Sequence, residues 1–212
     1  MITKKYFSCF FIILTFMFLV GCGKKKNKKL AQTYYKMSLL ELNEQNGGNA
    51  YRKSLEYVNK ALEQGEKAEY LALKATLLFR LNYEEEGLYY FDRALLCDPD
   101  SVVRTEILNN KACLMAEEGI KNNDLNKIND ALNVWANLQV DKDYLTPEVA
   151  YVNSAKVFLH KKDYKKVNDF LCKAIHLSPG YLDAHYYLAC NAYFLKPNHQ
   201  GARELANILR NN

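Results

Sequence analysis

The residues of this chain that could do chemistry include six cysteines and four histidines. Four of the cysteines are scattered, with no C-x-x-C pair and no spacing typical of a zinc site: Cys97, Cys113, Cys172 and Cys190. No histidine has a suitable ligand partner at helical spacing. We therefore expect no metal and no cofactor, and we interpret these four cysteines as small buried apolar residues. In an oxidising compartment they could also pair as disulfides.

Motifs of known enzyme chemistry are missing from the sequence. It contains no glycine-rich phosphate loop, no H-E-x-x-H and no G-x-S-x-G. The run Glu84-Glu85-Glu86 is typical of a solvated helix start. We expect a protein that is not an enzyme and has no small-molecule substrate; a periplasmic enzyme is the weaker alternative.

The N-terminus has the layout of a secretory signal peptide. Lys4 and Lys5 precede a largely apolar stretch of 14 residues, Phe7 to Val20. A membrane-spanning helix needs about 20 residues, so this stretch is short for a span. An uncleaved anchor helix is the alternative.

The next residues, Leu19-Val20-Gly21-Cys22, resemble the lipobox of bacterial lipoproteins. The resemblance implies that the Cys22 thiol receives a diacylglycerol and that the chain is cut just before it. Residues 1–21 would be the signal peptide, 22–29 a lipidated cysteine with a basic tether, and 30–212 the folded domain. Because Gly23 replaces the aspartate that retains such proteins at the inner membrane, the resemblance also implies an outer-membrane protein facing the periplasm.

The net charge of +5 comes from the tether. Seven of the 29 basic residues and none of the 24 acidic ones precede residue 30, which leaves 22 basic against 24 acidic residues. A nearly neutral folded part argues against nucleic-acid binding.

Two segments of the folded part repeat each other at an offset of 80 residues, 70–100 and 150–180. Ala75 corresponds to Ala155, Phe91 to Leu171, Ala94 to Ala174 and Pro99 to Pro179, so small and large apolar residues recur at the same places. Each copy consists of two amphipathic helical patterns joined by a short polar turn.

This pattern resembles the tetratricopeptide repeat, a helix–turn–helix unit of 34 residues. With position 1 at Ala68, Thr105 and Glu148, the small position 8 falls on Ala75, Ala112 and Ala155. The middle copy then has about seven extra residues within 117–124. Residues 30–66 form a further unit, 182–195 a fifth first helix, and 199–210 a closing helix. The resemblance implies an all-α solenoid of about four to five units with a concave groove; an irregular helical bundle is the alternative.

In that family, positions 2, 5, 9 and 12 of the first helices line the groove, which here includes Thr76, Phe79, Asn109, Lys156, Tyr186 and Tyr193. Each of these could instead serve packing. The resemblance implies a surface for another protein chain.

A lipoprotein made almost wholly of such repeats also resembles the type IV pilus pilotins, which escort secretin subunits to the outer membrane. Residues 107–119 and 144–179, with the Asn109-Asn110 pair and Asn153, are similar to the middle repeats of those proteins. The resemblance implies envelope partners, including a secretin. The alternative is a general envelope scaffold for barrel-assembly or peptidoglycan machinery.

Overall fold

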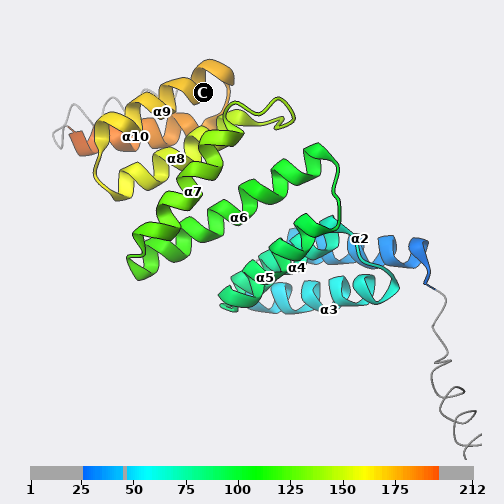
Figure 1. Ribbon diagram of the computed structural model, residues 1–212. Coiled ribbons are helices and arrows are strands. Elements are labelled where there is room, and N and C mark those ends of the chain that lie inside the picture. The colour runs from blue at the N-terminus through cyan, green and yellow to red at the C-terminus, as the bar shows by residue number, and fades with distance from the viewer. Residues whose placement is uncertain (1–25, 45–46, 196–212) are drawn as a thin grey trace, which may run out of the picture.

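A computed structural model describes residues 26–44 and 47–195, and this part of the chain contains α-helices and no strand (Figure 1). The helices are α2 (Lys28–Glu44), α3 (Gly48–Gln64), α4 (Ala68–Arg80), α5 (Glu84–Leu96), α6 (Ser101–Asn122), α7 (Leu125–Leu138), α8 (Pro147–His160), α9 (Tyr164–Leu177) and α10 (Leu182–Leu195). None of them is long and apolar enough to span a membrane.

Consecutive helices pack as pairs: α2 with α3, α4 with α5, α6 with α7, and α8 with α9. The first helices of successive pairs also touch, α4 with α6, α6 with α8, and α8 with α10. The fold is therefore a tetratricopeptide-repeat solenoid, as the sequence predicts. Helix α10 begins a fifth unit, and the predicted closing helix at 199–210 lies outside the described residues.

The apolar core is divided along the solenoid. Four clusters of buried residues follow one another, and each joins one helical pair to the first helix of the next pair. At position 24, the large residues Phe91, Trp135 and Leu171 are almost completely buried. Because each pair covers the apolar face of its neighbour, the pairs stabilise one another.

Small residues lie where the helices approach most closely. Ala75, Ala112, Ala155 and Ala189, all at position 8, are at most 1% exposed. At Gly87 a Cβ atom would lie 3.0 Å from the carbonyl oxygen of Ala75, so this position has no room for a larger side chain. The predicted repeat register is confirmed by these contacts.

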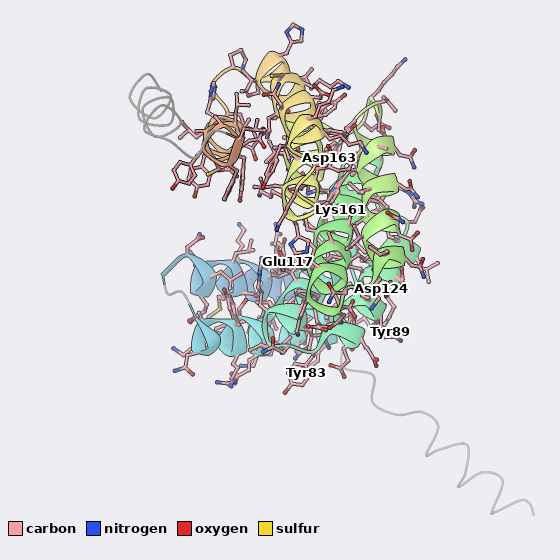
Figure 2. All side chains as sticks on the ribbon, turned by 90° about the vertical axis from the view of Figure 1, so that its left-hand side faces the viewer. Tyr83, Tyr89, Glu117, Asp124, Lys161 and Asp163 are labelled. Atoms are coloured by element: carbon pink, nitrogen blue, oxygen red, sulfur yellow. The ribbon has the colours of Figure 1, made fainter. Side chains whose placement is uncertain are left out.

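The turns that follow α4, α6 and α8 share one backbone geometry. Asn82, Asn123 and Lys162 have φ between 54° and 66°, which is the left-handed region. After each of them an amide N–H reaches back to a carbonyl five residues earlier: Tyr83 to Leu78, Asp124 to Gly119 and Asp163 to Phe158. This is the Schellman ending of a helix. Figure 2 labels a residue of each of these turns, Tyr83, Asp124 and Asp163.

The extra residues of the third repeat are helical. The sequence places them in the second-helix half of the repeat, within 117–124, but residues 117–122 are the last turns of α6, which spans 22 residues. Gly119 allows this extension to pack on α7, since a Cβ atom at this position would lie 2.8 Å from Cγ1 of Ile128. The longer first helix enlarges the inner surface of the solenoid at its centre.

Candidate functional site

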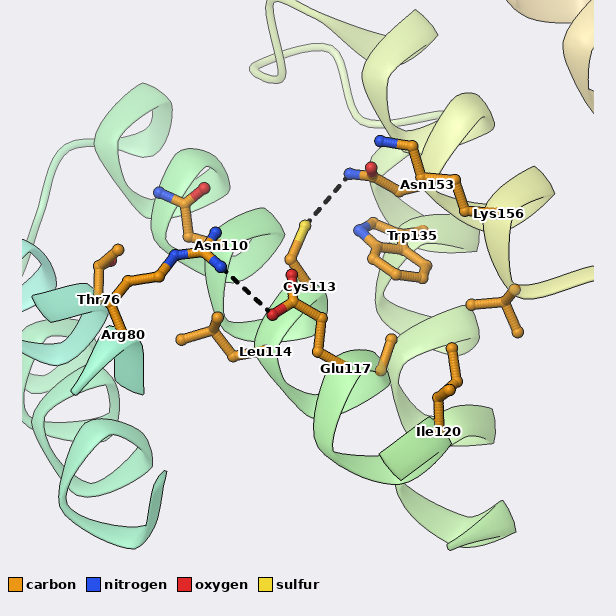
Figure 3. Close-up of a pocket in the computed structure, with 12 residues that line it drawn as sticks. Thr76, Arg80, Asn110, Cys113, Leu114, Glu117, Ile120, Trp135, Asn153 and Lys156 are labelled. Carbon is orange, nitrogen blue, oxygen red and sulfur yellow. Dashed lines mark hydrogen bonds and ion pairs between the residues drawn. The ribbon is translucent and has the colours of Figure 1, made fainter. Parts of the chain in front are cut away.

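The first pocket opens on the inner side of the solenoid among α4, α6, α7 and α8, with a volume of about 380 Å³ (Figure 3). Its lining residues come from four helices: Thr76, Arg80, Asn110, Cys113, Leu114, Ala116, Glu117, Ile120, Trp135, Asn153, Lys156 and Val157. Figure 3 shows the α4 side chains on one side, Asn153 and Lys156 on the other, and Cys113 with Glu117 between them.

The second pocket adjoins the first and has a volume of about 420 Å³. Helices α8, α9 and α10 and the turn after α8 line it: Leu159, His160, Lys162, Tyr164, Tyr187 and Phe194, together with Lys156. Lys156 also lines the first pocket, so the two form one inner groove.

One periodicity describes the first-helix residues of this inner groove. Positions 9 contribute Thr76, Cys113 and Lys156, and positions 13 contribute Arg80, Glu117, His160 and Phe194. Positions 6 contribute Asn110, Asn153 and Tyr187. Residues three, four and seven apart share one helical face, so positions 6, 9 and 13 form one stripe along the first helices. Position 12, which the sequence analysis assigned to the groove, also contributes, with Ala116 and Leu159.

An ion pair crosses the first pocket. The guanidinium of Arg80 on α4 lies 3.6 Å from the carboxylate of Glu117 on α6, and both side chains are about half exposed. Such a pair contributes little to stability, roughly 0–1 kcal/mol. Its side chains can turn toward a bound chain without a large energetic cost.

The floor of the first pocket is a hydrogen-bond network between three helices. The Oδ1 atom of Asn109 accepts from Trp135 Nε1 and from Asn153 Nδ2, each at 3.1 Å. Asn153 Nδ2 also lies 3.3 Å from Cys113 Sγ. Because Asn153 is nearly buried, these bonds fix the relative position of α6, α7 and α8.

The Cys113 thiol keeps its proton at neutral pH. Burial raises its pKa from an ordinary value of 9.0 to about 11, and the nearby Glu117 carboxylate adds to the shift. The thiolate, which is the nucleophile and metal ligand, is therefore scarce.

The four cysteines that the sequence analysis interpreted as buried apolar residues are all free thiols in the structure. Cys97, Cys113 and Cys190 are half-buried, whereas Cys172 is exposed, so the expectation that all four are buried is wrong for Cys172. In the described ranges, no group of three or more His, Cys, Asp or Glu side chains is arranged to hold a metal ion.

The structure places the predicted groove residues differently. Thr76 and Lys156 line the inner groove. Phe79 is 9% exposed and packs in the core beside Phe91. Asn109 lies beneath the groove, with its amide oxygen already engaged in the network.

On α10, Tyr186 and Tyr193 are 50% and 45% exposed, but they do not line the two pockets. Their neighbours Tyr187 and Phe194 do. Their role in binding therefore stays a prediction. Cys22 lies outside the described residues.

Sequence reasoning missed the groove residues at position 13, such as Arg80 and Glu117, and it singled out Asn110 and Asn153 at position 6 only for their resemblance to pilotin repeats. One signal was available, because the charges at positions 13 of the second and third repeats are opposite, Arg80 and Glu117. An opposite pair on adjacent helices indicates that the two positions face each other.

Comparisons with solved structures find proteins of the same fold. PilW, described as a widely conserved type IV pilus biogenesis factor, aligns over 87% of this chain and 80% of its own, with a TM-score of 0.67 and 17% identity. YrrB, a tetratricopeptide-repeat protein with an unusual peptide-binding site, aligns over 73% and 72%, with a TM-score of 0.52 and 22% identity. MamA from Desulfovibrio magneticus RS-1 aligns over 85% and 93%, with a TM-score of 0.55 and 18% identity.

No protein-family model and no curated protein sequence matches the chain. At these identities the structural likeness establishes the fold, and the fold is that of tetratricopeptide-repeat proteins.

Proposed function

We propose that this protein is a scaffold that binds another protein in its inner groove and assists secretin assembly in type IV pilus biogenesis, in the manner of a pilotin. The observation that carries the proposal is the groove itself, an open surface built from the first helices of successive repeats. The alignment with PilW over 87% of the chain supports the choice of the pilus among envelope systems.

The composition of the inner groove suits a polypeptide. The half-buried Ile120 offers an apolar contact, and the exposed side-chain amide of Asn110 can bond a backbone. A weak, rearrangeable ion pair, Arg80 with Glu117, adds polar contacts. Interfaces of this mixed character bind chains reversibly, which a factor that escorts a subunit and then releases it requires.

The proposal also includes an anchor at Cys22. Two or three acyl chains would hold the protein stably at a membrane, where one chain would not. The lysines of residues 24–29 would lie beside the lipid headgroups as a solvated spacer. Anchoring on the periplasmic face of the outer membrane would keep the groove at a high local concentration for its partner, so a modest affinity suffices.

The experiment that tests this function is deletion of the gene in its own bacterium, followed by analysis of secretin multimers in outer-membrane fractions. The proposal predicts loss of multimers and accumulation of secretin monomers, restored by the wild-type gene. Normal secretin multimers with defects in outer-membrane barrel proteins or in peptidoglycan would contradict it and favour a general envelope scaffold.

A further inference from the structure

Two cations of the second pocket have no acidic partner. Lys156 and Lys162 line this pocket with His160, and no carboxylate lies within 4 Å of either lysine among the described residues. Elsewhere on the inner side, Arg80 pairs with Glu117, and Lys121 lies 2.6 Å from Glu84. Among these cations of the described residues, those left without an acidic partner lie toward the α8–α10 end of the inner groove.

Aromatic rings form the walls beside these cations. The Lys156 ammonium lies 4.9 Å from the centre of the Tyr187 ring, a cation–π contact that keeps it half-buried at the pocket wall. Tyr164 and Phe194 stack with their ring centres 6.2 Å apart and their planes at 16°. No acidic side chain lines this pocket.

We infer that the second pocket recognises an acidic segment of the bound protein, with a glutamate or aspartate next to an aromatic or large aliphatic residue. The carboxylate would bond Lys156 and Lys162, and the apolar neighbour would lie between Tyr187 and Phe194. This inference rests on the proposed function, since it names the chemistry of the partner segment that the groove binds.

Charge complementarity favours an acidic segment over a neutral apolar segment in the second pocket. A neutral apolar segment would leave two ammonium groups facing it without partners, which costs free energy when they lose water. An acidic segment would neutralise them, and hydrogen bonds to charged groups are the stronger kind. The turn geometry also keeps Lys162 in place, since its backbone is held in the left-handed conformation at φ 58°.

The test compares two labelled peptides of equal length on the full-length protein in detergent micelles, by fluorescence anisotropy. One peptide has two glutamates flanking a phenylalanine, and the other has glutamines in their place. We expect the acidic peptide to bind about ten- to a hundredfold more tightly at low salt, with the difference shrinking as salt is raised.

The variants are Lys156→Gln and Lys162→Asn, with Lys142→Gln as a control of equal charge change on an exposed loop away from the pocket. Each pocket variant should weaken the acidic peptide about three- to tenfold and leave the glutamine peptide unchanged. Lys162→Asn keeps a residue that tolerates the left-handed backbone, so this variant is expected to fold.

Equal binding of the two peptides, binding of neither, or an equal effect of Lys142→Gln would overturn the inference. Binding of the acidic peptide only after removal of residues 196–212 would also overturn it, because the pocket's occupant would then be the chain's own end. These measurements involve no secretin. The peptide test can therefore fail while the secretin assay succeeds, and the secretin assay can fail while the peptide test succeeds.

Discussion

Asn109 lies beneath the groove and holds together the helices that form it. Its single amide oxygen accepts hydrogen bonds from Trp135 and from Asn153, so one side chain on α6 positions both α7 and α8. Its neighbour Asn110 lies exposed on the pocket surface. Two adjacent asparagines therefore differ: Asn109 holds the helices together, and Asn110 is free to contact a partner under the proposed function.

Replacing these two residues should separate the roles. Asn109→Ala leaves two buried donors without their acceptor, so we expect it to lower the free energy of unfolding by about 1–3 kcal/mol. Asn110→Ala, the matched control, should change it by less than about 0.5 kcal/mol. Urea unfolding followed by the fluorescence of Trp135, the single tryptophan, measures both. Equal stability of the two variants would contradict the network.

Cys113 predicts a pH dependence of stability. Its pKa is about 11 in the folded protein, above its ordinary value, so the folded state keeps the thiol proton that the unfolded state loses. The stabilisation is complete below about pH 9 and is lost as the pH rises toward 11, by up to about 1.4 kcal/mol per pH unit. Urea unfolding between pH 8 and 11 should show a steeper fall for the wild type than for Cys113→Ala. Parallel curves would show that the thiol stays exposed to water.

At the scale of the element, the long helix α6 depends on Gly119. A Cβ atom there would lie 2.8 Å from Cγ1 of Ile128 and 3.0 Å from the carbonyl oxygen of Asp124. The extension of α6 and the start of α7 can approach this closely only because the side chain is a hydrogen atom.

We therefore expect Gly119→Ala to destabilise the protein by about 1–3 kcal/mol, although alanine favours a helix. Gly180→Ala is the control, because its Cβ would meet no atom within 4 Å. Its effect should stay within about 0.5 kcal/mol. Thermal unfolding measures both variants. A Gly119→Ala protein as stable as the wild type would mean that α6 and α7 are less closely packed than the structure has them.

The sequence predicts the elements well and the groove face less well. Small residues at positions 8 and large ones at position 24 are required by packing inside each pair, so their spacing marks the register, as Ala75 and Phe91 illustrate. Which stripe of a first helix faces the groove depends on how successive pairs are rotated. That rotation follows from contacts between distant residues, such as Asn109 with Asn153, which no local pattern records.

The same reason explains why the predicted groove residues Tyr186 and Phe79 do not line the two pockets. A shift of one residue on a helix turns a side chain by about 100°. Tyr187 therefore lines the second pocket whereas Tyr186 does not, and Phe79 packs in the core whereas Arg80 lines the first pocket. Core residues are less often misassigned in this way, because their size identifies them in the sequence. Groove residues have no characteristic size, so a shift of one residue goes unnoticed.

At the scale of the whole molecule, the proposed anchor makes a separate prediction. Cys22→Ala should accumulate as an uncleaved precursor that incorporates no labelled palmitate, because the thiol that accepts the lipid is gone. Cys9→Ala, within the apolar stretch that precedes the proposed cleavage site, should be processed normally. Labelling and gel mobility in growing cells measure both. Normal palmitate labelling of the Cys22 variant would refute the lipoprotein hypothesis.

The repeat solenoid gives the molecule two layers of helices. The first helices supply most residues of the inner groove, with Trp135 and Tyr164 added from second helices. The second helices also carry exposed residues outside the groove, such as Tyr89 on α5 (Figure 2). A scaffold that acts through its groove should touch its partner on the first layer and not on the second.

Photo-crosslinking in intact cells tests this most directly. A benzophenone amino acid replaces Thr76, which lines the inner groove, or Tyr89, which is 57% exposed on the second layer. The proposed function predicts that light joins the secretin subunit to the Thr76 variant and not to the Tyr89 variant. Crosslinks to the secretin from Tyr89 alone, or crosslinks from Thr76 only to barrel-assembly or peptidoglycan proteins, would contradict it.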